Sequence, residues 1–152
     1  MDWTIKSFNG LTALELYRIL QLRINVFMLE QNCLYPECDN KDVHAKHLYA
    51  THEDKLVAYA RLLPPGISYT DTSIGRVIVH PNYRNQRLGN TLMVKAMESL
   101  TAEYPNQTIR ISAQAHLETF YKSLGFVVES DIYLEDDIPH IEMAYYTIKK
   151  EE

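Results

Sequence analysis

The segment from Val77 to Met93 combines residue types that could hold a phosphorylated ligand. A buried-looking strand ends at Pro81, a polar loop follows, and a helix begins immediately afterwards. Backbone N–H groups at a helix start lack internal partners and lie at the positive end of the dipole, where they attract anions. Arg84 and Arg87 add positive charge, and Gly89 lets the main chain approach a ligand closely. The pattern indicates a pyrophosphate cradle, but a helix start with two solvated arginines would show the same residues.

A second cluster of chemically active side chains lies in the stretch 39–47. Asp39, Asp42, His44 and His47 are residue types that bind metal ions. His47, however, begins a predicted strand. We therefore expect hydrogen bonds that fix the surrounding loop, and no metal.

Size and composition limit the classes of protein to which the chain can belong. Its 152 residues suit one domain, 1–152, and 46% of them are apolar, enough for a packed core. The net charge of −5 argues against a nucleic-acid partner and is compatible with a cationic one. No apolar run approaches the ~20 residues that span a bilayer, and the first residues do not resemble a signal peptide. We expect a cytoplasmic protein without a membrane partner, in which Cys33 and Cys38 are reduced thiols.

The elements that position these residues follow from hydrophobic periodicity and turn signals. Thr12 and Glu15 match a capping box at the start of a helix that runs to Phe27 or Leu29. A long loop, 30–46, separates this helix from the next strand. A second helix starts near Leu88, and a short third one covers 117–124. Strands are predicted at 3–8, 47–53, 56–63, 73–80, 108–113, 126–128 and 141–148, so the chain is a mixed α/β protein.

Two motifs resemble those of the GNAT superfamily of N-acetyltransferases. Arg84-Asn-Gln-Arg-Leu-Gly89 is similar to the acetyl-CoA-binding motif R/Q-x-x-G-x-G/A, with Arg87 in place of the usual middle glycine. The segment 114–126, which contains Phe120-Tyr121 before Gly125-Phe126, is similar to the second signature of the superfamily. The spacing between the two motifs also fits.

Further stretches are similar to the ElaA-like branch of this superfamily. They are Leu22 to Phe27, Glu30 to Cys33, Tyr35 to Glu37 with Asp39, Gly75 to Val79, Ala113 to Leu117, and Glu135 to Ile141. The resemblance covers nearly the whole chain. It implies the GNAT acyl-CoA N-acyltransferase fold, with a central mixed β-sheet flanked by helices.

The resemblance also implies a cosubstrate, acetyl-CoA, and the residues that hold it. The strand before the phosphate loop would bind the pantetheine arm through its backbone, and a backbone N–H there could stabilise the carbonyl oxygen. The implied coenzyme-binding residues are Val77, Ile78, Val79, Arg84, Asn85, Gln86, Arg87, Leu88, Gly89, Asn90, Gln114, Phe120 and Tyr121.

Three side chains are candidates for catalysis of acetyl transfer to an amine. Tyr121 matches the tyrosine that commonly protonates the coenzyme thiolate, and the alternative role is that of a core residue on a short helix. His140 is the first candidate for the base, because histidine titrates near neutral pH. Glu30, acting through a water chain, is the alternative.

Several functional alternatives stay open at this point. A non-catalytic acyl-CoA-binding sensor would need the phosphate loop but not Tyr121, and a GNAT enzyme could use a different acyl donor. The acidic residues Glu30, Glu37, Asp39 and Asp42 suggest a cationic amine acceptor. Exposed strand edges, including that of the final strand, suggest a homodimer.

Overall fold

A computed structural model describes residues 1–147 of the chain. In chain order its strands and α-helices are β1 (Asp2–Ser7), α1 (Ala13–Arg23), β2 (Lys46–His52), β3 (Lys55–Leu63), β4 (Thr72–Val79), α2 (Leu88–Glu103), β5 (Ile109–Gln114), α3 (Glu118–Ser123), β6 (Val127–Val128), β7 (Tyr133–Glu135) and β8 (Ile138–Tyr145). The predicted mixed α/β class is confirmed. None of the helices in residues 1–147 has the length and apolar character that crossing a membrane requires.

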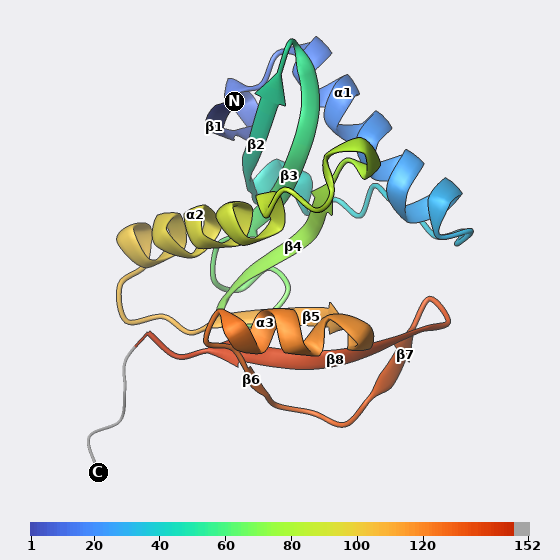
Figure 1. The fold of residues 1–152 in the computed structure, drawn as a ribbon. Coiled ribbons are helices and arrows are strands. Elements are labelled where there is room, and N and C mark those ends of the chain that lie inside the picture. Colours follow the sequence, from blue (N-terminus) through green and yellow to red (C-terminus); the bar gives the residue numbers. More distant parts are fainter. Residues whose placement is uncertain (148–152) are drawn as a thin grey trace.

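The strands form one sheet in the order β1-β2-β3-β4-β5-β8-β6, with β7 also paired to β8 (Figure 1). Among the strands of residues 1–147, only β4 and β5 pair in parallel, and α2 forms the crossover between them. β8 begins earlier than predicted, and residue 148 of the predicted strand lies outside the described residues. Within residues 1–147, β8 has β5 on one side and β6 and β7 on the other.

Helices cover both faces of the sheet, and β3 shows how its side chains divide between them. Ala58 and Ala60 face the core around α2 and α3, whereas Tyr59 faces a smaller core that includes Ile19 and Leu22 of α1. This period of two is the one expected for a strand buried on both sides.

The first helix begins as predicted and ends differently. The Glu15 backbone N–H donates to Thr12 Oγ1 at 3.1 Å, and the Thr12 N–H donates to Glu15 Oε1 at 2.8 Å, which completes the capping box. After Arg23 the chain continues as a π-helical segment, Ile24–Glu30. Apolar spacing does not distinguish this form from an α-helix, and π-helical turns often occur at functional sites.

A β-bulge in β4 changes which face the strand presents. Tyr59 of β3 pairs with Ile78 and Arg61 pairs with Gly75, so two residues of β4 oppose the single Ala60. Arg76 occupies the bulge with φ +51°. As a result Ile74 packs in the α2 core, whereas Ile78, four residues later, packs in the α1 core.

The sheet splits next to this bulge. β4 and β5 pair only through Thr72 with Ile109 and Ser73 with Arg110. Beyond these pairs, the second half of β4 and the second half of β5 diverge. Their facing backbone groups are therefore not joined in a ladder.

Two buried arginines, Arg23 and Arg61, hold the long loop between α1 and β2. Arg23 Nε donates to Glu37 Oε1 at 2.6 Å, and its Nη1 donates to Asp42 Oδ1 at 2.7 Å. Arg61 of β3 forms a two-pronged contact with Asp39 at 2.8 and 2.9 Å. The predicted hydrogen bonds of this loop are therefore made chiefly by guanidinium groups.

Arg76 completes this network from the bulge. Its Nε donates to Glu37 Oε1 at 3.0 Å, and its Nη2 lies 3.4 Å from Asp39 Oδ2. We call these six residues the arginine–carboxylate network: Arg23, Glu37, Asp39, Asp42, Arg61 and Arg76. No group of three or more His, Cys, Asp and Glu side chains suited to a metal occurs within residues 1–147.

His47 lies against this network and is fully buried. Its Nδ1 accepts from the Tyr59 hydroxyl at 2.7 Å and its Nε2 donates to the Asp42 carbonyl at 3.0 Å, an assignment that uses the neutral ring. Burial lowers the pKa of His47, and the charges of Arg23 and Arg61 lower it further.

Substitution Arg23→Met should reduce the free energy of unfolding by about 3 kcal/mol, because Glu37 and Asp42 would lose a buried partner. Urea denaturation at pH 7 measures this change. Lys6→Met removes the more exposed pair with Glu15 and should change stability little. Equal losses in the two variants would contradict a structural role for the network.

The free energy of unfolding should fall as the pH drops below the ordinary histidine pKa of about 6.5. The reason is that the unfolded chain then binds a proton at position 47 that the folded chain excludes. The slope should approach ~1.4 kcal/mol per pH unit. Urea denaturation from pH 8 to pH 5 should show a flatter profile for His47→Gln, and parallel profiles would refute the assignment.

Candidate active site

A cleft of about 1510 Å³ occupies the split between β4 and β5. This volume exceeds the ~300–1,000 Å³ of pockets for drug-sized ligands, so the cleft has room for a large ligand and a second, smaller one. Its lining includes the start of α2 and α3. It also includes the π-helical segment, the loop that follows it and the turn between β7 and β8.

The predicted coenzyme-binding residues line this cleft, with one exception. Gln86 is exposed and does not contribute to the lining, because it lies on the outer side of the phosphate loop. The three candidates for catalysis, Glu30, Tyr121 and His140, also line the cleft.

The start of α2 leaves backbone donors free at the cleft. Arg87 is the N-cap residue and its side chain makes no capping hydrogen bond. The first helical N–H with an internal partner is that of Thr91, which donates to the Arg87 carbonyl at 3.2 Å. The N–H groups of Leu88, Gly89 and Asn90 therefore remain available to an anion, as the sequence indicates.

Arg87 adopts the backbone conformation that glycine favours. Its φ is +58°, in the left-handed region, so it reproduces the geometry of the usual motif glycine with a side chain attached. A Cβ on Gly89 would meet Phe120 and Val79 only at 3.7 and 3.8 Å, ordinary contact distances. An alanine would therefore fit at position 89, in agreement with the Gly or Ala found at the last position of the motif.

The free edge of β4 supplies further backbone groups. The His80 N–H donates to the Val57 carbonyl on the β3 side at 2.8 Å. Backbone N–H and C=O groups of successive residues point to opposite sides of a strand. Those of Val77 and Val79 therefore point toward the cleft. Arg84 Nε donates to the Val79 carbonyl at 3.1 Å, in agreement with this orientation.

Arg84 and Glu30 bind each other. Arg84 Nη2 lies 3.0 Å from Glu30 Oε2, and Nη1 contacts the other oxygen. The hydrogen bonds from Arg84 lower the pKa of Glu30, which makes this carboxylate a weaker proton acceptor. The pair also joins the phosphate loop to the π-helical segment.

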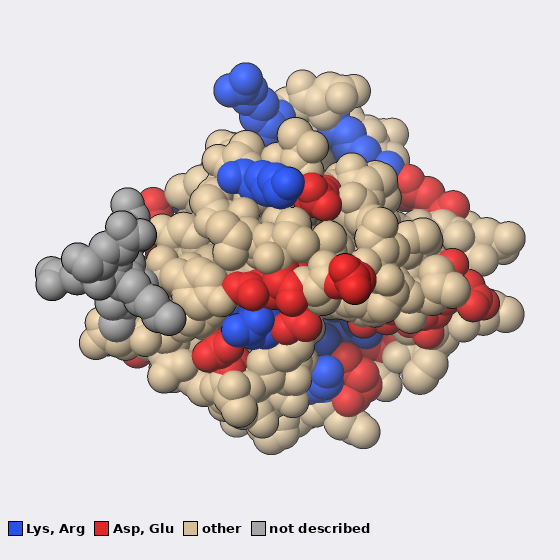
Figure 2. All heavy atoms as spheres, turned by 90° about the horizontal axis from the view of Figure 1, so that it is seen from below, with Lys and Arg blue, Asp and Glu red and all other residues tan. Residues whose placement is uncertain are grey.

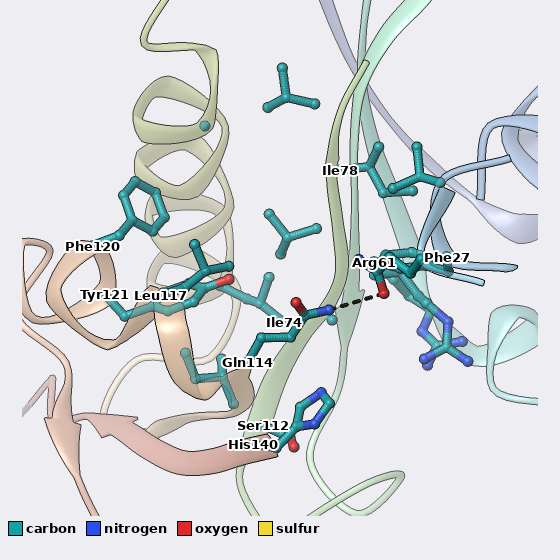
Figure 3. Close-up of a pocket in the computed structure, with 18 of the residues that line it drawn as sticks. Phe27, Arg61, Ile74, Ile78, Ser112, Gln114, Leu117, Phe120, Tyr121 and His140 are labelled. Carbon is teal, nitrogen blue, oxygen red and sulfur yellow. Dashed lines mark hydrogen bonds between the residues drawn. The ribbon is translucent and has the colours of Figure 1, made fainter. Parts of the chain in front are cut away.

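Tyr121 projects from α3 into the cleft, and Figure 3 shows its hydroxyl directed toward β4. The ring is nearly buried beside Phe120 and Phe126. Burial raises the pKa of Tyr121 to about 12, so the phenol is protonated at physiological pH. Its hydroxyl has no hydrogen-bond partner within residues 1–147. The residue is both a core residue and a cleft residue.

Two contacts join the walls across the cleft. Gln114 at the end of β5 donates to Gln31 Oε1 at 3.2 Å, shown as a dashed line in Figure 3. Cys33 Sγ lies 3.4 Å from the Asp136 carbonyl in the β7–β8 turn. These contacts close one side of the cleft where strand pairing is absent.

His140 lies opposite Gln114 in the β5–β8 ladder and is largely buried. Its Nδ1 donates to the Ile138 carbonyl at 2.7 Å, which leaves Nε2 as the atom that can gain or lose a proton. Glu135 Oε2 lies 3.3 Å from Nε2. The Tyr133 ring stacks on the imidazole.

The acidic loop residues that suggested a cationic ligand are all paired with arginines. Glu30 contacts Arg84, and the other three belong to the arginine–carboxylate network. Figure 2, which views the molecule from below, shows acidic and basic side chains next to each other near the centre of this face. The residues Glu30, Glu37, Asp39 and Asp42 therefore give no support to a cationic ligand.

Sequence reasoning assigned no role to two residues of this site, Arg76 and Glu135. Both lie inside stretches that resemble the ElaA-like branch, and this was the available signal. The position of Arg76 depends on the bulge in β4, which only the pairing with β3 reveals. Glu135 lies on β7, a strand of three residues that forms by pairing with β8.

Comparison with solved structures places this architecture in a known class. An acyl-CoA N-acyltransferase from Pseudomonas aeruginosa superposes with a TM-score of 0.91 at 43% identity, covering 95% of this chain and 98% of that one. Escherichia coli ElaA superposes with a TM-score of 0.90 at 40% identity and the same coverage. The fold is thus that of the acyl-CoA N-acyltransferases.

The family follows from the sequence comparisons. The Acetyltransferase (GNAT) domain model matches residues 21–147. Protein ElaA of E. coli K12 is 40% identical over 151 residues, 98% of this chain and 99% of that protein. The chain belongs to the GNAT acetyltransferase family, in its ElaA-like branch, and hence to the acyl-CoA-dependent acyltransferases.

Arg87→Gly should give a free energy of unfolding about 1 kcal/mol higher than Arg87→Ala, because only glycine adopts φ +58° without steric cost. Both variants remove the same guanidinium, so the difference isolates the backbone term. Urea denaturation of the two proteins measures it. Equal stability would mean that the left-handed conformation at this residue is not strained.

Proposed function

We propose that this protein transfers an acetyl group from acetyl-CoA to a primary amine by direct attack in a ternary complex. The observation that carries the proposal is the split between β4 and β5. It places free backbone donors of α2, the open edge of β4 and the Tyr121 hydroxyl around one cleft. Membership of the GNAT family supports the use of an acyl-CoA.

The residues present fit acetyl-CoA. The uncapped N–H groups of Leu88, Gly89 and Asn90, with Arg87 beside them, suit a pyrophosphate. The cleft-facing backbone of Val77 and Val79 suits the amide groups of a pantetheine arm. Bound there, the thioester supplies the activated acetyl group, and no metal is needed for the reaction.

Two groups of the chain would act on the reacting atoms. A backbone N–H of β4, in the Val77–Val79 stretch, would stabilise negative charge on the thioester carbonyl oxygen. Tyr121 would donate a hydrogen bond to the leaving sulfur and supply its proton. With a pKa of about 12 the phenol is protonated at neutral pH and so can donate a hydrogen bond to sulfur.

The acceptor enters as an ammonium ion, since an alkyl amine has a pKa near ~10.4, and must lose a proton before attack. Of the two candidates for the base, His140 has the better geometry, with Nε2 as its exchanging nitrogen. Glu30 is less suitable because Arg84 holds both of its oxygens. Glu135 and Asp136, which line the same end of the cleft, support a positively charged acceptor.

Tyr121→Phe should lower kcat about 100-fold, with acetyl-CoA affinity nearly unchanged, because the ring still packs while the donor is lost. Release of coenzyme A thiol across a panel of polyamines, amino acids and basic peptides measures kcat, and calorimetry measures affinity. Tyr17→Phe, on the exposed face of α1, is the matched control and should behave as the wild type.

The same assay separates the alternatives. Amine-dependent release that is equal in Tyr121→Phe would retain the enzyme and remove Tyr121 from this role. Tight acetyl-CoA binding without release for any amine would favour a sensor. Faster release of thiol from propionyl-CoA than from acetyl-CoA would indicate that the natural acyl donor is not acetyl-CoA.

A further inference from the structure

Glu135 differs from the other carboxylates around the cleft in its partners. Four carboxylates line the cleft: Glu30, Asp39, Glu135 and Asp136. Arginines neutralise the first two. Within the described residues, Glu135 has no guanidinium partner. Its oxygens lie 3.3 Å from His140 Nε2 and 3.3 Å from Ser112 Oγ.

The contact between Glu135 and His140 makes the two side chains one pair. His140 Nδ1 donates to the Ile138 carbonyl, so Nε2 is the ring nitrogen left for this contact, and Glu135 Oε2 lies 3.3 Å from it. A carboxylate and an imidazole at this distance are coupled electrostatically, because a proton on either one makes the contact more favourable. An acceptor at this end of the cleft would therefore meet the two side chains together.

The other titratable groups near His140 are paired, have raised pKa values or are exposed to solvent. Arg110 on β5 and Glu142 on β8 form an ion pair at 3.2 Å. Burial raises the pKa of Tyr69 to about 12 and also raises that of Tyr133. Burial likewise raises the pKa of Cys33, across the cleft, and the aspartates of the β7–β8 turn are exposed.

We propose that Glu135 is a catalytic residue that receives the proton of the acceptor amine, with His140 as its partner in one acid–base unit. The inference rests on the proposed function. Half of the Glu135 side chain is exposed (50%), so an acceptor in the cleft can reach it, whereas His140 is only 9% exposed. His140, on the neighbouring strand β8, lies against this carboxylate and positions it.

With an alkylammonium acceptor, one proton passes from the ammonium to Glu135, which frees the nitrogen lone pair. The nitrogen then bonds to the thioester carbonyl carbon, and the C–S bond breaks with its electron pair on sulfur. The excess proton on nitrogen reaches sulfur by way of Tyr121 and solvent. Glu135 returns its proton to solvent, so the products are an amide, a thiol and one proton.

The test compares wild type, Glu135→Gln, His140→Gln and the double variant in the thiol-release assay from pH 6.5 to pH 10. Glu135→Gln should lower kcat/KM for an alkylamine at least 30-fold at pH 7, while acetyl-CoA affinity stays within twofold. The deficit should narrow toward pH 10, where the amine is already neutral. The double variant should be no slower than the slower single variant, because the two side chains act together.

Asp137→Asn is the matched control. It makes the same change of charge in the β7–β8 turn at a residue that does not line the cleft, and it should keep wild-type activity. Glu135→Asp should recover part of the activity lost in Glu135→Gln, since the carboxylate is restored at a shorter reach. Unfolding midpoints of all variants verify folding.

Several outcomes overturn the inference. One is wild-type activity in Glu135→Gln, and another is a deficit that stays constant across the pH range, as a purely structural role predicts. Multiplicative losses in the double variant also contradict a single unit. If the wild type turns over amines and Glu135→Gln is unimpaired, the role of Glu135 is refuted but the proposed function stands. A wild type without amine-dependent turnover overturns both.

Discussion

The arginine–carboxylate network is the interaction on which the cleft depends. Arg23, Arg61 and Arg76 come from three different elements and meet on one loop through Glu37, Asp39 and Asp42. The loop forms a wall of the cleft, and Arg76 belongs to the bulge that turns the β4 backbone toward it. Four of the six side chains, Arg23, Glu37, Asp42 and Arg61, are buried, and burying charges is costly unless they are paired. The network therefore fixes one geometry of loop and bulge together.

Local signals accounted for much of the fold that could be predicted. Thr12 and Glu15 lie three residues apart, so the capping box could be predicted from the sequence, as could the breaks at Pro81 and Gly125. Strand β7 could not be predicted, because three residues carry too little periodicity and the strand forms by pairing with β8. The bulge at Arg76 could not be predicted for a similar reason, because its position depends on the register between β4 and β3.

The site shows the same division between short-range and long-range information. The phosphate loop and Tyr121 were accessible through motifs. The pairing of Arg84 with Glu30, 54 residues apart, was not, and it joins a residue expected to bind phosphate to one expected to act as a base. The number of acidic residues along the loop suggested an excess of negative charge. In the structure, arginines from other elements neutralise these carboxylates. Partners distant in sequence thus decide which acidic residues remain reactive.

The two residue pairs that join β4 to β5 make the sheet two half-sheets connected by a narrow hinge. A ligand that bonds along the open edge of β4 would behave as an inserted strand and supply contacts that the chain itself lacks. The folded state would then gain RT ln(1 + [L]/Kd) from occupancy, ~2.7 kcal/mol at a hundredfold excess over Kd. The cellular supply of such a ligand would in this way regulate the lifetime of the protein as well as its turnover.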